Sequence, residues 1–258
     1  MAVTTGARVR RLVARVQTRE RLVHLTVPGT RQRVHARAGT SDVAAFAEVV
    51  SEWSGVDLPF EPGAILDVGA NVGYASVVLS LRYPGARIVA VEPEPSNVRL
   101  LRRNVKRLPV EVVEAAVWPR GGTLSLDDPG KGRWGYRVRD EAGPVRAVTM
   151  PELVARAGGE TVGLVKIDIE GAELDVFSAD TTWLHRVDAL AVELHDRYRP
   201  GCTAAVETAV ARAWPAYERS AAGEKAVFVR SAPAARCAAA STVLPHGSST
   251  PRSRPCPG

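Results

Sequence analysis

The residues with the clearest chemical meaning lie in an apolar run that ends in an acid and then turns on glycines. Residues 65–74 read Ile-Leu-Asp-Val-Gly-Ala-Asn-Val-Gly-Tyr. Gly69 and Gly73 carry no Cβ, so the backbone there can approach a ligand closely. Asp67 places a carboxylate beside the turn, which suits a ligand with a cationic end. The stretch therefore predicts a ligand-binding loop between a buried strand and a helix.

Two further acids stand at the ends of the next two apolar runs. Glu92 follows Gly73 by roughly 20 residues, the spacing at which an acid reaches ribose hydroxyls in open α/β folds; Pro93 then turns the chain away. Glu114 is followed by Ala115 and Ala116, whose small side chains leave room for a flat ring such as adenine. A single acid here would suit a helix cap, but three at successive strand ends predict a ligand at the carboxyl edge of a sheet.

The loop differs from the dinucleotide-binding fingerprint G-x-G-x-x-G. Asn71 stands where that fingerprint needs glycine, and a pyrophosphate would not favour the carboxylate of Asp67 at its edge. A nicotinamide-dependent oxidoreductase is thus an alternative with two features against it. A domain that binds its ligand without turnover is another.

Two later runs end in candidates for moving a proton. Asp168 and Glu170 end one run, and Glu193 and His195 end the other. His195 is the predicted general base, because imidazole titrates near neutral pH and a neighbouring Asp168 or Glu193 would hold its tautomer. The alternative is a surface histidine at a loop entrance. Lys166, inside the first run, is predicted to pair with an acid.

The same acids suggest a metal as an alternative to the histidine base. Asp168, Glu193 and Asp196 offer three carboxylates at neighbouring strand ends, which suits Mg²⁺ better than zinc. Such an ion would orient and acidify the acceptor. The leading prediction contains no metal ligand, and Mg²⁺ stays the second possibility.

From residue 64 onward, short apolar runs alternate with segments of helical spacing. The predicted strands cover 64–68, 87–91, 110–113, 163–168 and 188–194. The predicted helices cover 72–82, 95–108, 172–179 and 203–213, and a hairpin over 216–220 and 225–230 closes the domain. This alternation predicts a doubly wound, mostly parallel α/β sheet covered on both faces.

The predicted domain spans residues 41–230 of the 258-residue chain. Residues 1–40 carry a basic amphipathic helix and two short strands, and residues 231–258, rich in Ala, Pro and Ser, are predicted to be disordered. Residues 119–148 read as an inserted hairpin that would cover an acceptor. Its aromatic and cationic side chains are Lys131, Arg133, Trp134, Tyr136 and Arg137.

Charge and apolar patterning limit the partners. The net charge is +6, but residues 1–40 hold nine arginines against one acid, and residues 41–230 carry a net −5. A nucleic-acid groove in the domain, and with it an RNA-modifying enzyme, is therefore disfavoured. No apolar stretch approaches the roughly 18 residues of a membrane span, and no secretory signal is seen, so a cytoplasmic protein is expected. The three cysteines form no C-x-x-C pair.

Together these segments resemble the FkbM-type S-adenosylmethionine-dependent methyltransferases. The matching pieces are residues 38–43 with the helix after them, 65–73, 91–93 with Asn97, Leu101 and Asn104, 165–173 and, more weakly, 192–193. The resemblance covers roughly residues 20–230. It implies a seven-stranded Rossmann-like sheet with an antiparallel C-terminal hairpin, S-adenosylmethionine as methyl donor, and commonly a hydroxyl acceptor in natural-product, sugar or lipid chemistry.

The resemblance also implies roles for individual residues. Asp67, Gly69, Asn71 and Gly73 would hold the methionine end of the donor, and Glu92 the ribose. The other predicted cofactor contacts are Ala70, Tyr74, Pro93, Glu114, Ala115 and Ala116. The acceptor does not carry over, because such families span many substrates; a small molecule is expected.

Overall fold

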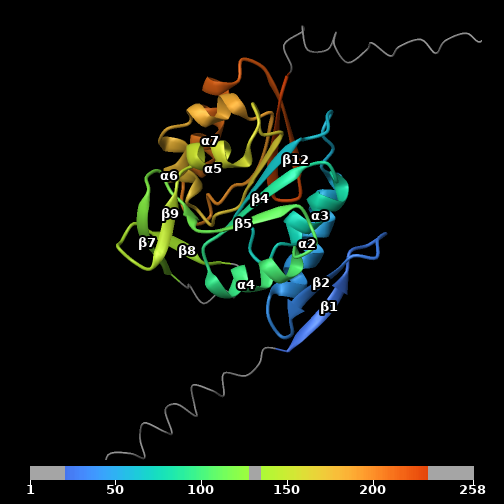
Figure 1. Cartoon of the computed structure of the whole chain (residues 1–258). Coiled ribbons are helices and arrows are strands. Elements are labelled where there is room, and N and C mark those ends of the chain that lie inside the picture. The colour runs from blue at the N-terminus through green and yellow to red at the C-terminus, as the bar shows by residue number, and fades with distance from the viewer. Residues whose placement is uncertain (1–20, 128–134, 232–258) are drawn as a thin grey trace, which may run out of the picture.

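The computed structural model describes residues 21–127 and 135–231, apart from the side chains of residues 54–55, and it is built around one large sheet (Figure 1). The strand order is β12-β13-β11-β10-β3-β4-β5. These strands are β3 (Ala64–Val68), β4 (Arg87–Glu92), β5 (Val110–Glu114), β10 (Leu164–Ile167), β11 (Ala189–Glu193), β12 (Tyr217–Ala222) and β13 (Lys225–Arg230). β3, β4, β5, β10 and β11 pair in parallel, whereas β13 pairs antiparallel with both β11 and β12. The predicted sheet with its antiparallel C-terminal hairpin is confirmed.

Helices cover both faces of this sheet, as Figure 1 shows. One face packs against α5 (Met150–Ala157), α6 (Glu173–Ser178) and α7 (Cys202–Ala213), and the other against α2 (Asp42–Gly55), α3 (Tyr74–Arg82) and α4 (Pro95–Asn104). Successive strand residues point to opposite faces, so Leu66 and Val68 join the first core while Ile65 joins the second. All five residues of β3 are buried, as expected for a parallel strand covered on both sides.

The insertion forms a second sheet at the rim of the first. Its strands are β6 (Ala116–Val117), β7 (Gly122–Asp127), β8 (Arg137–Arg139) and β9 (Val145–Val148), in the order β6-β9-β7-β8. β7 and β8 are the two strands that the sequence predicted, and they pair antiparallel. This sheet has its own apolar cluster, made of Ala116, Trp118, Leu124, Val145, Ala147 and Ala172. Lys131, Arg133 and Trp134 of the predicted lid lie outside the described residues.

The N-terminal strands form an antiparallel hairpin of β1 (Leu22–Thr26) and β2 (Arg33–Arg37). Its last residue, Arg37, belongs to the arginine-rich residues 1–40 but is buried. The Arg37 guanidinium is buried and donates to Asp42 at 2.8 and 2.9 Å and to Asn97 at 2.9 Å. The hairpin is thus tied to the starts of α2 and α4.

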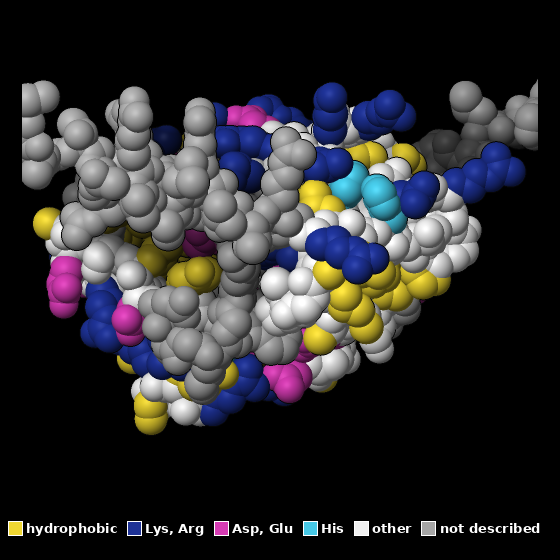
Figure 2. All heavy atoms as spheres, turned by 90° about the horizontal axis from the view of Figure 1, so that it is seen from below, with side chains coloured by type: hydrophobic (Ala, Val, Ile, Leu, Met, Phe, Trp, Pro, Cys, Tyr) yellow, Lys and Arg dark blue, Asp and Glu magenta, His cyan; other side chains and the backbone are white. Residues whose placement is uncertain are grey.

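The surface seen from below carries mixed charges. On the hairpin, the rings of His24 and His35 lie 4.6 Å apart. Figure 2 shows histidine side chains beside Lys and Arg side chains, and elsewhere on this face the basic groups alternate with acidic and apolar ones.

Among the helices within the described ranges, none combines the length and apolar character needed to cross a bilayer. The predicted basic helix and the C-terminal tail lie outside those ranges.

Candidate active site

A cavity of about 320 Å³ opens at the carboxyl ends of β3, β4, β10 and β11. This is the edge at which open α/β sheets bind ligands, and the volume suits a small molecule. The predicted site residues that line it are Gly69, Ala70, Asn71, Tyr74, Glu92, Pro93, Ala115, Ala116, Asp168 and Glu193. Four predicted residues are absent from this lining: Asp67, Gly73, Glu114 and His195.

The turn after β3 is set by close backbone approach at Gly69. Its φ is +75°, and a Cβ added there would lie 1.7 Å from the carbonyl oxygen of Asp168, at the end of the neighbouring strand. Gly73 serves a different purpose, since a Cβ there would lie 2.4 Å from the Leu101 side chain of α4. Gly69 therefore shapes the cavity, while Gly73 lets α3 and α4 pack.

This contact predicts a stability difference between two glycine variants. Gly39 has the same φ of +75°, but among the residues that the structure describes none lies within 4 Å of an added Cβ. We expect Gly39→Ala to cost about 1 kcal/mol from the left-handed backbone alone. Gly69→Ala should cost about 2 kcal/mol more because of the overlap. Urea unfolding of both variants measures this difference, and equal losses would show that the turn can shift at no cost.

Asp67 is held inside the fold. Its carboxylate is fully buried, accepts a hydrogen bond from Ser76 at 2.6 Å, and lies 3.1 Å from the Lys166 ammonium. Lys166 also donates to the Gly69 carbonyl oxygen at 2.6 Å. The predicted pairing of Lys166 with an acid is present in the structure. Asp67 thus acts on the loop through Lys166 and Ser76, and the structure does not support direct contact with a ligand.

Glu92 ends β4 and lines the cavity, as the sequence predicted. Its carboxylate accepts hydrogen bonds from the backbone N–H groups of Asn71 at 2.9 Å and Glu94 at 3.1 Å, and from the Asn97 amide at 3.2 Å. Asn71 adopts a left-handed φ of +50°, which turns its N–H toward this carboxylate. Burial raises the pKa of Glu92 to about 7, although the three donors act in the opposite direction. The carboxylate is thus fixed in direction and costly to ionise in the absence of a ligand.

Glu114 does not reach the cavity. β5 is an edge strand, so the Glu114 side chain extends toward solvent, where it lies 3.1 Å from the Arg102 guanidinium. Ala115 and Ala116 after it are buried and line the cavity as predicted. Of the three strand-end acids Asp67, Glu92 and Glu114, only Glu92 lines the cavity.

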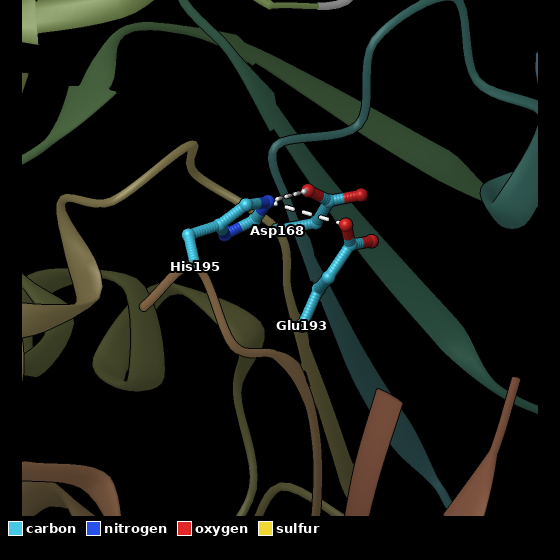
Figure 3. A group of neighbouring side chains, drawn as sticks. All are labelled: Asp168, Glu193 and His195. Carbon is cyan, nitrogen blue, oxygen red and sulfur yellow. Dashed lines mark ion pairs between the residues drawn. The ribbon is translucent and has the colours of Figure 1, made fainter. Parts of the chain in front are cut away.

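His195 is fully buried and does not line the cavity. Figure 3 shows its ring beside the carboxylates of Asp168 and Glu193. Its Nδ1 lies 3.0 Å from Glu173, and its Nε2 lies 3.2 Å from Glu193 and 3.8 Å from Asp168. Burial lowers the pKa of His195, but Glu173 and Glu193 outweigh it and raise the pKa to about 10. A buried imidazole among carboxylates cannot contact an acceptor, so the structure does not support His195 as the general base.

The acids around His195 differ in their placement. Asp168 and Glu193 line the cavity, and so does Glu170, which has a left-handed φ of +55°. Asp196 faces away and caps α7, where its carboxylate accepts from the N–H groups of Gly201 at 3.0 Å and Thr203 at 2.9 Å. The predicted trio of Asp168, Glu193 and Asp196 is therefore not assembled.

A buried lysine at the site was missed in the sequence. The Lys225 ammonium lies 2.7 Å from Glu52 of α2 and 3.1 Å from Glu193, and all three line the cavity. Lys225 stands opposite Glu193 in the antiparallel register of β11 and β13. The sequence signal was a lysine opening an apolar strand beside a strand that ends in glutamate.

The insertion reaches the site, as the lid prediction requires. Tyr136 and Val138 line the cavity. The Arg137 guanidinium lies 4.1 Å from the centre of the Tyr198 ring, and that ring stacks on His195 at 5.7 Å. These contacts connect β8 to the carboxyl end of β11 and place the insertion on the side of the cavity occupied by Asp168 and Glu193.

Comparisons with known proteins point to one family. The hexuronic acid methyltransferase AglP of Haloferax volcanii is 28% identical over 139 residues, covering 52% of this chain and 57% of AglP. The 31-O-demethyl-FK506 methyltransferase FkbM of Streptomyces tacrolimicus is 27% identical over 187 residues, covering 55% and 68% of the two chains. The AMB antimetabolite synthetase AmbE of Pseudomonas aeruginosa is 29% identical over 203 residues, covering 62% of this chain and 10% of AmbE.

The family match and the site fall on the same part of the chain. The chain aligns with about a tenth of AmbE and with 57% of AglP, so it spans only part of these relatives. The model of the methyltransferase FkbM domain matches residues 67–212, which include the end of β3, the cavity-lining acids Glu92, Asp168, Glu170 and Glu193, and the insertion. This match covers more than half of the residues of the chain, and the chain therefore belongs to the FkbM methyltransferase domain family.

Proposed function

We propose that this protein transfers a methyl group from S-adenosylmethionine to a hydroxyl oxygen of a small molecule, such as a natural product, a sugar or a lipid-like compound. The observation that carries the proposal is the pairing of the Gly69 turn with the oriented carboxylate of Glu92 at one end of the cavity. Family membership supports methyl transfer and weighs against the nicotinamide alternative.

The donor half of the cavity fits S-adenosylmethionine. Glu92 is aimed by three donors and retains acceptor capacity for two ribose hydroxyls. Ala115 and Ala116 leave space beside it for the adenine ring. The turn at Gly69, which lines the cavity, would hold the methionine end. The donor brings a methyl group that is already activated on a cationic sulfur, so the protein must chiefly orient the acceptor and exclude water.

The acceptor half lies between β10, β11 and the insertion. Asp168 and Glu193 face the cavity there, and Tyr136 and Val138 of the insertion also line it. We assign Asp168 and Glu193 the task of orienting the hydroxyl and taking its proton, with His195 as a positioning residue behind them. An oxygen acceptor on a small molecule agrees with the names of two relatives, which act on a hexuronic acid and on 31-O-demethyl-FK506. A cytoplasmic location stays a prediction.

Binding of S-adenosylhomocysteine, the demethylated product, tests the donor site without chemistry. Calorimetry should give a micromolar or tighter constant, about −8 kcal/mol, and no heat with NADH or NADPH. Glu92→Gln should weaken binding at least tenfold, because it removes a charged acceptor for ribose hydroxyls. Glu114→Gln is the matched control, since Glu114 occupies the same register position on the edge strand.

Two results would contradict the donor assignment. One is no heat and no thermal stabilisation at millimolar S-adenosylhomocysteine. The other is equal weakening by Glu92→Gln and Glu114→Gln. If the ligand binds as expected, transfer of a labelled methyl group to a panel of hydroxylated small molecules tests the acceptor side. Asp168→Asn should then lower turnover and leave S-adenosylhomocysteine binding intact.

A further inference from the structure

One side of the His195 ring has no hydrogen-bond partner. His195 is fully buried, and its Nε2 makes no hydrogen bond within residues 21–127 and 135–231. Nε2 nevertheless points between two carboxylates, 3.2 Å from Oε1 of Glu193 and 3.8 Å from Oδ1 of Asp168, as Figure 3 shows. A buried polar atom without a bond is costly unless something else satisfies it.

Asp168 and Glu193 each turn one carboxylate oxygen toward Nε2 of His195. Asp168 directs Oδ2 toward Lys166 at 3.9 Å, and Glu193 directs Oε2 to Lys225 at 3.1 Å. The opposite oxygens, Oδ1 and Oε1, face His195. Oε1 of Glu193 also lies 3.4 Å from the Arg197 guanidinium, a long contact from a half-exposed side chain. Two lysines thus hold the outer oxygens, and the inner ones converge.

The other ring nitrogen of His195 is fixed by a buried acid. Oε1 of Glu173 lies 3.0 Å from Nδ1 and also accepts from the Ile169 N–H at 3.1 Å, and Glu173 is itself fully buried. Metal binding displaces a proton from the imidazole. With Nδ1 still donating to Glu173, the lone pair of Nε2 then points at the carboxylate oxygens. A carboxylate behind a histidine in this manner is the usual outer-shell arrangement of metal-binding histidines.

We propose that Asp168, Glu193 and His195 bind a divalent first-row transition-metal ion. Their ligand atoms all lie within 4.8 Å of one another. Bonds of about 2.1 Å place neighbouring ligands of one ion about 3 Å apart and opposite ligands about 4.2 Å apart, so small side-chain shifts complete the site. Two carboxylates also balance the charge of a divalent ion. Oε2 of Glu170, 3.9 Å from Nε2, supplies a fourth ligand.

The donor set selects among ions. Imidazole nitrogen is a preferred ligand of iron, nickel and zinc ions, and the carboxylates of this mixed set also suit Mn²⁺, whereas Mg²⁺ favours oxygen alone. The site thus differs from the sequence-based alternative both in its ligands and in its metal. Because Asp168, Glu193 and Glu170 line the cavity, the open positions of the ion would face the acceptor. The role of the ion in lowering the pKa of an acceptor hydroxyl rests on the proposed function. The binding of the ion does not depend on that function.

Metal titration of chelator-treated full-length protein tests the site directly. Calorimetry with MnCl₂, CoCl₂ and ZnCl₂ should show one ion per chain at micromolar or tighter affinity, and MgCl₂ at least tenfold weaker binding. His195→Ala and Glu193→Gln should each weaken Mn²⁺ binding at least a hundredfold. His185→Ala and Asp180→Asn change an exposed histidine and an exposed acid elsewhere, and they should have no effect.

A spectroscopic readout keeps the test decisive if a variant fails to fold. Pulsed electron paramagnetic resonance of Mn²⁺ on the unaltered protein should detect a coordinated histidine nitrogen. The proposal is overturned if folded protein binds none of the three ions below 1 mM, if the variants bind as the unaltered protein does, or if bound Mn²⁺ has only oxygen ligands. Binding of S-adenosylhomocysteine without metal binding would sink this inference alone, and the reverse result would sink only the donor assignment.

Discussion

Replacing Lys166 with methionine is expected to lower the free energy of unfolding by about 4 kcal/mol, the range measured when one partner of a buried ion pair is removed. Lys166 is buried, and its ammonium lies 3.1 Å from the fully buried carboxylate of Asp67. Methionine fills the space but leaves that carboxylate without a counter-charge. It also removes the hydrogen bond to the Gly69 carbonyl oxygen, so the loop beside the cavity should loosen as well.

Urea unfolding followed by circular dichroism measures this loss. Lys106→Met is the control, because Lys106 is exposed and its replacement should change stability by no more than about 0.5 kcal/mol. The double variant Lys166→Met, Asp67→Asn should recover part of the loss, since both charges are then removed. A loss below about 1 kcal/mol in the single variant would mean that Asp67 finds another partner.

The stability of the ligand-free protein is expected to fall by about 3 kcal/mol through Glu92 alone as the pH rises from 4.5 to 8. Burial raises the folded-state pKa of Glu92 to about 7 from 4.5. The folded state therefore binds this proton more tightly than the unfolded state, so the stabilisation is complete below pH 4.5 and is lost as the pH rises through 7. The difference between the two pKa values, 4.5 and about 7, corresponds to roughly 3 kcal/mol.

Comparison of three proteins isolates this effect. Unfolding free energies of Glu92→Gln across the pH range should lack the Glu92 contribution, whereas Glu114→Gln should retain it. Ligand binding should follow the opposite trend: if ribose hydroxyls donate to the ionised carboxylate, S-adenosylhomocysteine affinity should rise toward pH 8. A pH profile of stability that is the same in Glu92→Gln and the unaltered protein would show that Glu92 ionises normally.

The main sheet was predictable because its signals are local. β3 is continuously apolar, ends in an acid and is followed by a glycine turn, and these features fix both a strand and its functional end. α5 was missed, although Thr149 and Glu152 form a capping box that the sequence displays. The two-residue strand β6 carries too little pattern to be recognised.

The site was only partly predictable because side-chain direction depends on distant packing. Glu92 and Glu114 both end strands, but α4 buries the first while the edge position of β5 exposes the second. His195 was predicted to be a general base at the end of its strand, but the packing of α6 places Glu173 behind it. Lys225 depends on the register between β11 and β13, which no local pattern specifies.

The insertion has an apolar cluster of its own, separate from the clusters that hold the seven-stranded sheet together. Trp118, Leu124 and Val145 belong to this cluster, while Tyr136 and Val138 line the cavity from the same unit. Evolution can therefore vary this unit without repacking the half of the protein assigned to the donor. In the proposed methyltransferase, lineages could diverge in acceptor preference by drift within this small sheet while inheriting an unchanged cofactor half.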